Sequence, residues 1–475
     1  MLYAVLMWMA RIALRWYYRE VQIIGAERVP LDVPMLVVAN HPNALMDPML
    51  VATAMPRRLT FTGKATLFEK PLLPLLLRNV GVVPLRRASD EAARRAAGGA
   101  ADPKRNIEAF KAIVGALVAR RAVLIFPEGK SHDEPGMSPL KTGTARIALQ
   151  ATEAGVVDLV VLPVGLVFED KSEPRTRILV EVGDPLRIAE WRASHTEGSG
   201  AAEALTAEID RRLREVTVNF SSVEHAGDVV TVSRLLADSG AEPEALGGGA
   251  PYSETVELTR RADAVRRSLA GADPAIAARA EALRERVRSI HRVADEHGLL
   301  IADVAIETDA GAAALFVVRE AAITAVAGPL ALWGRIMHWL PLRLARAIAR
   351  RGSTSGADPA MYTVVSGLVL VLAFYALAGA LVWHFAGPWW AAVFLVSLPV
   401  SAGWDFRLRD RAARARRRIR AFWLFRRQPE LQPELRRQLA AAREDAVALE
   451  RDVQAASPTP NALGQAASAS PNAGG

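Results

Sequence analysis

A histidine and an aspartate lie six positions apart, at residues 41 and 47, within the segment VVANHPNALMDP of residues 37–48. The apolar run before His41 is typical of a strand, so the chain has to turn between the two polar side chains. In such a turn the carboxylate of Asp47 can bind one ring nitrogen, fix the tautomer and leave the other nitrogen as a base. Such a base would take a proton from an alcohol that attacks an activated acyl carbonyl directly, without an enzyme nucleophile.

Two ordinary structural roles compete with this interpretation. Asp47 followed by Pro48 is typical of a helix start, with aspartate as the N-cap and proline at the first helical position. His41 could equally be a strand-end histidine whose hydrogen bonds are satisfied by the protein. The spacing alone leaves this choice open.

The elements that would position the pair alternate between strands and helices over residues 21–220. Strands are predicted in the runs MLVVA, VGVVPL, AVLIF, LVVLPVGLVF and RILVEV, which are rich in Val, Leu and Ile and bounded by Pro and Gly. Helical spacing is found in IEAFKAIVGALVARR, TGTARIALQATEAG and the closing AEALTAEIDRRLREVTVNF. The alternation predicts an α/β fold over residues 21–225, with a mixed or parallel sheet and helices on its faces.

Composition limits the kinds of site and partner. The chain has 475 residues, a formal net charge of +8 and no cysteine. The lack of cysteine excludes disulfides, thiolate metal sites and a cysteine nucleophile. Basic clusters beside apolar segments indicate an anionic lipid bilayer as a partner. Nucleic acid is not expected, because the sequence has no zinc-finger spacing and no alternation of basic and aromatic residues.

Residues 1–20 are predicted to form an interfacial amphipathic helix. Arg11, Arg15 and Arg19 recur every four residues, with aromatic residues nearby. A basic amphipathic helix of this kind lies in the headgroup layer of a membrane. The alternative is an ordinary surface helix that packs on its own domain.

Residues 301–428 are predicted to be a membrane region. Segments 363–383 and 388–404 carry no charged residue, so we expect transmembrane helices near them, joined by a tight turn with tryptophans beside it. Arginines flank the pair but are missing from the turn, which by the positive-inside rule places both flanks, and the α/β domain, on the cytoplasmic side of a cell (inner) membrane. Segment 321–341 contains Gly328-Pro329 and Arg335, so we expect a break there and a re-entrant or interfacial placement.

The remaining parts of the chain suggest no chemistry. Residues 226–300 combine a Gly/Pro/Ala-rich linker with a helical region, and residues 429–475 are predicted to be a polar helix, with coiled-coil character as one alternative, followed by a disordered tail.

Four sequence blocks lie in order within the predicted α/β domain. The first is the His41 segment, and the next two are GKATLFEKPLLPLLLRNVGVVPLRR (63–87) and IFPEGKSHDEPGMSPLKTG (125–143). The fourth is VLPVGL (161–166). Together they resemble the ordered motifs of the PlsC-like glycerolipid acyltransferases, the lysophosphatidate and glycerol-3-phosphate acyltransferases. The resemblance covers roughly the first half of the chain and implies that family's fold and activity.

At two places the sequence differs from the usual family pattern, and both differences point to one branch of the family. Five residues separate His41 from Asp47, where the family motif has four, and the Phe-Pro-Glu-Gly signature at 126–129 continues with Lys-Ser-His-Asp instead of Thr-Arg. Both features resemble the fungal-type glycerol-3-phosphate/dihydroxyacetone-phosphate acyltransferases. The acceptor therefore stays open among glycerol-3-phosphate, dihydroxyacetone phosphate and lysophosphatidate.

The resemblance implies a role for each matching residue. His41 would be the general base and Asp47 the residue that orients it. Arg87 would hold the acceptor's phosphate, which a guanidinium can bind in a bidentate manner; alternatively it is a surface arginine paired with Asp90 or Glu91. The other residues assigned to substrate binding are Lys64, Glu128, Gly129, Lys130, Ser131 and Pro163. Pro163 would shape the acyl end of the site.

These implications predict a membrane-bound O-acyltransferase of phospholipid biosynthesis. The donor would be acyl-CoA or acyl-carrier protein, and the acceptor a glycerol phosphate. No cofactor is expected, and no metal, since the His and Asp spacing fits no zinc or non-haem iron pattern. The alternatives are a catalytically inactive membrane adaptor, another lysophospholipid acyltransferase specificity, and a metal-dependent phospholipid hydrolase.

Overall fold

The computed structural model describes residues 2–65, 68, 77, 79–85, 104–195, 200–240, 251–269, 273–352 and 359–456. The chain forms two units, each built from two segments. Unit 1 comprises Met1–Ser221 with Pro329–Phe406, and unit 2 comprises Ser222–Gly328 with Arg407–Gly475. The side chain of Lys64, the whole of Arg87 and the tail of residues 457–475 lie outside the described residues.

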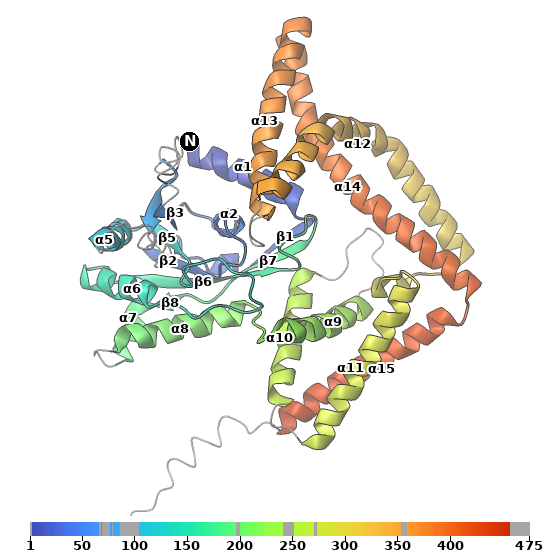
Figure 1. The fold of residues 1–475 in the computed structure, drawn as a ribbon, viewed down its shortest axis with the longest axis horizontal. Coiled ribbons are helices and arrows are strands. Elements are labelled where there is room, and N and C mark those ends of the chain that lie inside the picture. The colour runs from blue at the N-terminus through green and yellow to red at the C-terminus, as the bar shows by residue number, and fades with distance from the viewer. Residues whose placement is uncertain are drawn as a thin grey trace, which may run out of the picture. The chain divides into compact units, whose positions relative to one another are not determined.

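Unit 1 contains a mixed sheet whose described strands follow the order β1-β7-β6-β2-β5-β3-β4, with β8 paired to β6 (Figure 1). Neighbouring strands are parallel, except that β6 pairs antiparallel with β7 and β8. The predicted α/β class is confirmed. The strands are β1 (Glu20–Ile24), β2 (Met35–Ala39), β3 (Leu59–Lys64), β4 (Val82–Leu85), β5 (Ala122–Ile125), β6 (Val160–Phe168), β7 (Arg177–Val182) and β8 (Leu186–Arg187).

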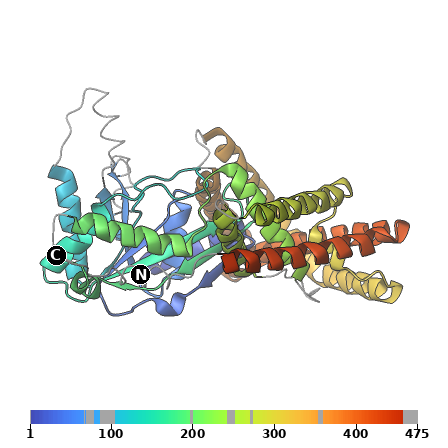
Figure 2. The same ribbon diagram turned by 90° about the horizontal axis from the view of Figure 1, so that it is seen from below.

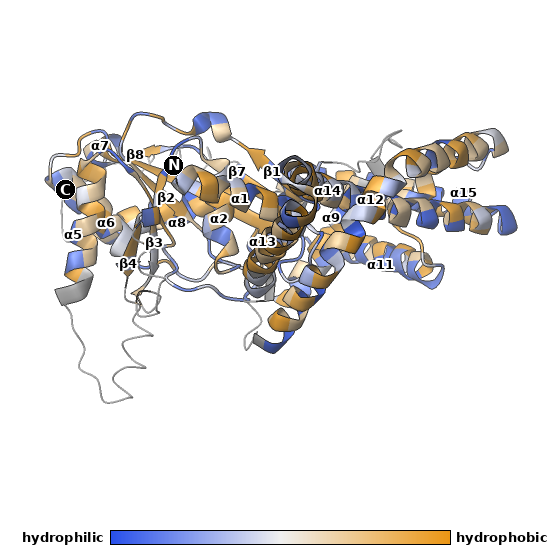
Figure 3. Cartoon of the chain, turned by 90° about the horizontal axis from the view of Figure 1, so that it is seen from above, coloured by the Kyte–Doolittle hydropathy of each residue, from blue (hydrophilic) through white to orange (hydrophobic). Residues whose placement is uncertain are grey.

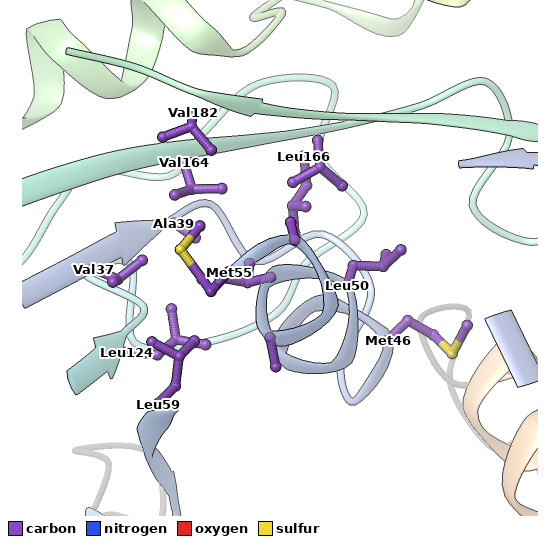
Figure 4. Close-up of a cluster of buried hydrophobic side chains, with 14 of the residues drawn as sticks. Val37, Ala39, Met46, Leu50, Met55, Leu59, Leu124, Val164, Leu166 and Val182 are labelled. Atoms are coloured by element: carbon purple, nitrogen blue, oxygen red, sulfur yellow. The ribbon is translucent and has the colours of Figure 1, made fainter. Parts of the chain in front are cut away.

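Helices cover both faces of this sheet, which explains why the central strands are apolar without alternation. In β2, Val37 and Ala39 belong to a core shared with α1 and α2, whereas Leu36 and Val38 belong to a second core shared with α5, α6 and α8. Figure 4 shows residues of the first core, and Figure 2 shows α8, in green, running along the sheet. These helices are α1 (Leu2–Tyr17), α2 (Met46–Ala54), α5 (Lys104–Val118), α6 (Gly143–Glu153), α7 (Ile188–Ala193) and α8 (Ala201–Val216).

Helix α1 packs one of its faces on its own domain. Leu14 is buried in the first core, where Val364 of a C-terminal helix also lies, whereas Trp8 is 61% exposed. One face of α1 therefore fits the alternative of a surface helix that packs on its own domain. The placement of the other face in a headgroup layer stays a prediction.

Among the described residues, three helices are long and apolar enough to cross a membrane: α12 (Ala310–Gly352), α13 (Pro359–Ala386) and α14 (Pro388–Arg427). In Figure 3 much of the α13 ribbon is orange, the colour of hydrophobic residues. The two predicted transmembrane segments lie in α13 and α14, which are joined at Gly387, a residue with a φ of 90°. Within unit 1, Arg335 of α12 pairs with Asp405 of α14 at 3.0 Å.

The predicted break at Gly328-Pro329 is wrong, because α12 continues through both Pro329 and Pro341. A proline inside a helix removes one backbone hydrogen bond, and a long run of good helix formers around it can offset this loss. The surrounding alanines and leucines are of this type.

Unit 2 is helical in its described part. Its core joins α9, α11, α15 and a short 3-10 helix, and includes Leu235, Ile290 and Leu439. The predicted helical region and polar helix therefore pack together, although they are far apart in sequence. The elements are α9 (Val223–Gly240), α10 (Tyr252–Ser268), α11 (Pro274–Glu296), η4 (Ile301–Ala305) and α15 (Leu431–Ala456).

Candidate active site

The parallel pairing of β2 and β5 brings two of the motif blocks together. Val38 is in register with Ile125, so both strands end at the same edge of the sheet. The His41 segment follows β2, and the Phe-Pro-Glu-Gly signature begins directly after the end of β5. Loops after adjacent parallel strands are the usual location of a site in an α/β fold.

His41 and Asp47 form the hydrogen bond that their spacing predicts. Nδ1 of His41 lies 2.8 Å from Oδ2 of Asp47, and the imidazole stacks on the ring of Phe126 with centroids 4.0 Å apart. The hydrogen bonds of His41 to described residues are formed by its backbone N–H and by Nδ1, which leaves Nε2 available. The imidazole is therefore held through one nitrogen and one ring face, as a general base requires.

Asp47 does not cap α2 in the way that the helix-start alternative proposed. Leu45 is the N-cap, and Asp47 lies inside the first turn, where Oδ2 accepts the backbone N–H of Asn43 at 2.7 Å. The side chain is fully buried, and its second oxygen, Oδ1, has no hydrogen-bond partner in the part of the chain that the structure describes. Burial raises the pKa of Asp47 above its usual value, and the hydrogen bonds from His41 and Asn43 lower it in part.

The turn between the two residues is fixed at several points. Asn40 exchanges two hydrogen bonds with the backbone of Leu166 in β6, at 2.8 and 3.0 Å. Ala44 has a φ of 42°, in the left-handed region, which costs an L-residue about 1–2 kcal/mol. The additional residue of this turn is thus accommodated by a strained conformation, which persists because the neighbouring contacts hold it.

Glu128 connects the two loops. Its Oε1 accepts the backbone N–H of His41 at 2.8 Å, while Oε2 accepts the backbone N–H of Ser138 at 2.8 Å and also bonds to Nε2 of His132. Glu128 is only 2% exposed, so these bonds form in a water-poor environment where charged hydrogen bonds are strong. The carboxylate holds the backbone of the general-base candidate in place.

Gly129 makes the sharp turn after Glu128 possible. Its φ is 74°, and a Cβ atom at this position would lie 2.7 Å from Nζ of Lys141. Only glycine avoids both the backbone strain and the close contact.

The other predicted site residues have varied positions. Lys64 ends β3, next to β5, and Lys130 is exposed in the loop after Glu128, followed by Ser131. Pro163 is buried in β6, in register with Val38 of β2. Contacts of these residues, and of Glu128, with a substrate stay predictions.

The sequence motifs did not indicate Lys171, nor the separate partners of His132 and Asp133. These last two do not act as a pair: His132 bonds to Glu128, and Asp133 pairs with Lys171 at 2.6 Å. Lys171 lies in the loop between β6 and β7, far along the chain from both motif loops, and no signal in the sequence marks it.

Comparisons with known proteins agree with the motif resemblance. Residues 20–167 match the family model described as Acyltransferase. The chain is 31% identical over 134 residues to glycerol-3-phosphate O-acyltransferase 2 of Saccharomyces cerevisiae, covering 28% of this chain and 17% of the yeast enzyme. It is 34% identical over 125 residues to glycerol-3-phosphate O-acyltransferase 1 of that yeast, covering 25% of this chain and 16% of that enzyme. The matched part is therefore a small fraction of either relative.

Two further proteins match more of this chain. An uncharacterized acyltransferase of Schizosaccharomyces pombe is 23% identical over 303 residues, which cover 47% of this chain and 45% of the yeast protein. The crystal structure of the 1-acyl-sn-glycerophosphate (LPA) acyltransferase PlsC from Thermotoga maritima is 20% identical, with a TM-score of 0.33, covering 45% of this chain and 78% of PlsC. Residues 20–167 thus match an acyltransferase domain, and the chain is similar to glycerol-3-phosphate O-acyltransferases over part of its length.

Proposed function

We propose that the chain is a membrane-bound O-acyltransferase that moves a fatty acyl group from a thioester to a hydroxyl of glycerol-3-phosphate. The observation that carries the proposal is the bond between His41 and Asp47, located at the loop edge of an acyltransferase domain. Glycerol-3-phosphate is our first choice of acceptor because two relatives carry this substrate in their names. Lysophosphatidate and dihydroxyacetone phosphate are the other candidates.

The proposed mechanism assigns one proton transfer to His41. Nε2 takes the proton from the acceptor hydroxyl as its oxygen attacks the thioester carbonyl. The tetrahedral intermediate then expels the thiolate, which takes up the proton from the imidazolium. Asp47 keeps the proton of the resting imidazole on Nδ1 and stabilises the imidazolium. General-base catalysis of this kind contributes about 10²- to 10⁴-fold in rate.

Cationic side chains would bind the phosphate of the acceptor. Arg87 and Lys64 are assigned this role by the motif resemblance, and exposed Lys130 follows the signature. The donor would be acyl-CoA or acyl-carrier protein, and no cofactor takes part.

The three apolar helices support attachment to a membrane. Arginine-rich sequence on both sides of the α13–α14 pair favours a cytoplasmic position for the acyltransferase domain, at the cell (inner) membrane. A water-soluble acceptor and an acyl thioester would both be available there.

The test is transfer of a labelled acyl group by the purified full chain, from acyl-CoA and from acyl-carrier protein, to each of the three acceptors. We expect transfer to glycerol-3-phosphate that persists in the presence of a chelator. A preference for another acceptor would correct the specificity. Release of free fatty acid that chelation abolishes would support the hydrolase, and absence of turnover with lipid binding that survives His41→Ala would support the adaptor.

A further inference from the structure

Lys171 lies where three loops of unit 1 meet. Its ammonium group donates to the carbonyl oxygen of His132 at 2.9 Å and to that of Pro42 at 3.4 Å, and it pairs with Oδ1 of Asp133 at 2.6 Å. At its other end, the backbone oxygen of Lys171 accepts a hydrogen bond from Nδ2 of Asn43 at 2.9 Å. One residue thus contacts the turn between His41 and Asp47 at two consecutive positions.

The loop that carries Lys171 is itself well braced. Oδ1 of Asp170 accepts the backbone N–H of Ser172 at 2.8 Å, and the hydroxyl of Thr176 donates to the carbonyl of Asp170 at 2.9 Å. Arg175 fixes the far end of the loop to α1, since its backbone N–H donates to the carbonyl of Tyr17 at 2.7 Å and its guanidinium to that of Tyr18 at 3.0 Å. A side chain on a braced loop has a fixed position, so the residues that it contacts are held in place as well.

The contacts of Lys171 indicate that it positions other residues and does not bind the substrate. An ammonium group has three N–H donors. Lys171 directs them at three protein oxygens, and its side chain is 23% exposed. No donor is left over for a phosphate, in contrast to an exposed lysine such as Lys130.

We infer that Lys171 is a positioning residue for acyl transfer, which holds the His41 turn against the Glu128 loop. The inference rests on the proposed function. The turn needs this contact because it contains one residue more than the family motif and places Ala44 in a left-handed conformation. Lys171 secures the turn immediately after His41, while Glu128 secures the backbone of His41 itself. A displacement of the imidazole by about 1 Å can cost about 10²-fold in rate.

The experiment compares Lys171→Met, Lys171→Arg and Asp133→Asn with Lys111→Met, which changes an exposed lysine of α5. Steady-state kinetics are measured with glycerol-3-phosphate and acyl-CoA. For Lys171→Met we expect kcat to fall about 10- to 100-fold, with both KM values within about threefold of the parent. Lys171→Arg should recover most of kcat, Asp133→Asn should lose less than Lys171→Met, and Lys111→Met should match the parent.

Hydrogen–deuterium exchange of the full chain provides a measurement that does not depend on activity. We expect faster exchange in residues 40–47 of Lys171→Met, with the thermal midpoint close to that of the parent. Unchanged exchange there, unchanged kcat, or a raised KM for glycerol-3-phosphate at constant kcat would each overturn the inference. If the parent transfers no acyl group while Lys171→Met still loosens residues 40–47, the proposed function fails and the positioning contact stands.

Discussion

Glu128→Gln tests whether the two motif loops are held together as the geometry indicates. The substitution keeps the size and shape of the side chain but replaces one carboxylate oxygen by an NH₂ group. In the parent, one oxygen accepts the backbone N–H of His41, and the other accepts that of Ser138. A glutamine can accept from only one of these, so the other N–H faces a second donor in a buried position.

The magnitude follows from these contacts. A lost hydrogen bond to a charged group, with its buried donor left unsatisfied, costs about 2–3 kcal/mol. For a domain of roughly 200 residues this corresponds to a fall in Tm of about 5–10 °C. Because one of the two affected donors is the backbone N–H of His41, acyl transfer should also fall by at least about tenfold.

The assay is thermal unfolding together with labelled acyl transfer, on the purified full chain in detergent. Glu134→Gln is the control, since Glu134 is an exposed residue of the same loop. If Glu128→Gln matched Glu134→Gln in both Tm and rate, Glu128 would not connect the loops, and the description of the site would be wrong.

Two further substitutions probe the turn itself. Asp47→Asn should keep the hydrogen bonds from Asn43 and from Nδ1 of His41, which share one oxygen, but lose at least about 10²-fold in acyl transfer, because a neutral amide does not stabilise the imidazolium. Burial raises the pKa of Asp47, so the folded chain retains a proton that the unfolded chain has lost. The contribution of the Asp47 carboxyl group to the free energy of unfolding therefore falls as the pH rises above 3.8, the ordinary pKa of an aspartate. Asp47→Asn should remove this component from a pH series of unfolding midpoints, and an unchanged series would contradict it. Ala44→Gly should relieve the left-handed strain and raise the free energy of unfolding by up to about 1 kcal/mol in denaturant titrations, whereas a loss of stability would show that Ala44 is not strained.

The sequence predicted the pairing of His41 with Asp47 better than it predicted the order of the strands that position the pair. The spacing of His41 and Asp47 is local, so a turn of a few residues is enough to bring the side chains together. The class of the domain could also be predicted, because apolar strand runs and helical spacing alternate over the first half of the chain. Strand order is not encoded in this local pattern. That β2 lies between β5 and β6 decides which loops meet, and only the structure shows it.

Glu128 and Lys171 illustrate this difference. The signature marked Glu128 as important, but its contact with the backbone N–H of His41 depends on the neighbouring positions of β2 and β5. Lys171 belongs to no motif and reaches the turn from the loop between β6 and β7. The prediction of a break at Gly328-Pro329 was wrong for a related reason. It considered only the local effect of glycine and proline, and not the stability of the long helix that surrounds them.

The most direct test of the central claim is the rate of acyl transfer by His41→Ala relative to the parent, with thermal unfolding as the check on folding. General-base catalysis by His41 predicts a folded variant whose kcat for glycerol-3-phosphate falls by at least about 10²-fold. A folded His41→Ala protein that transfers the acyl group within about threefold of the parent rate would contradict it.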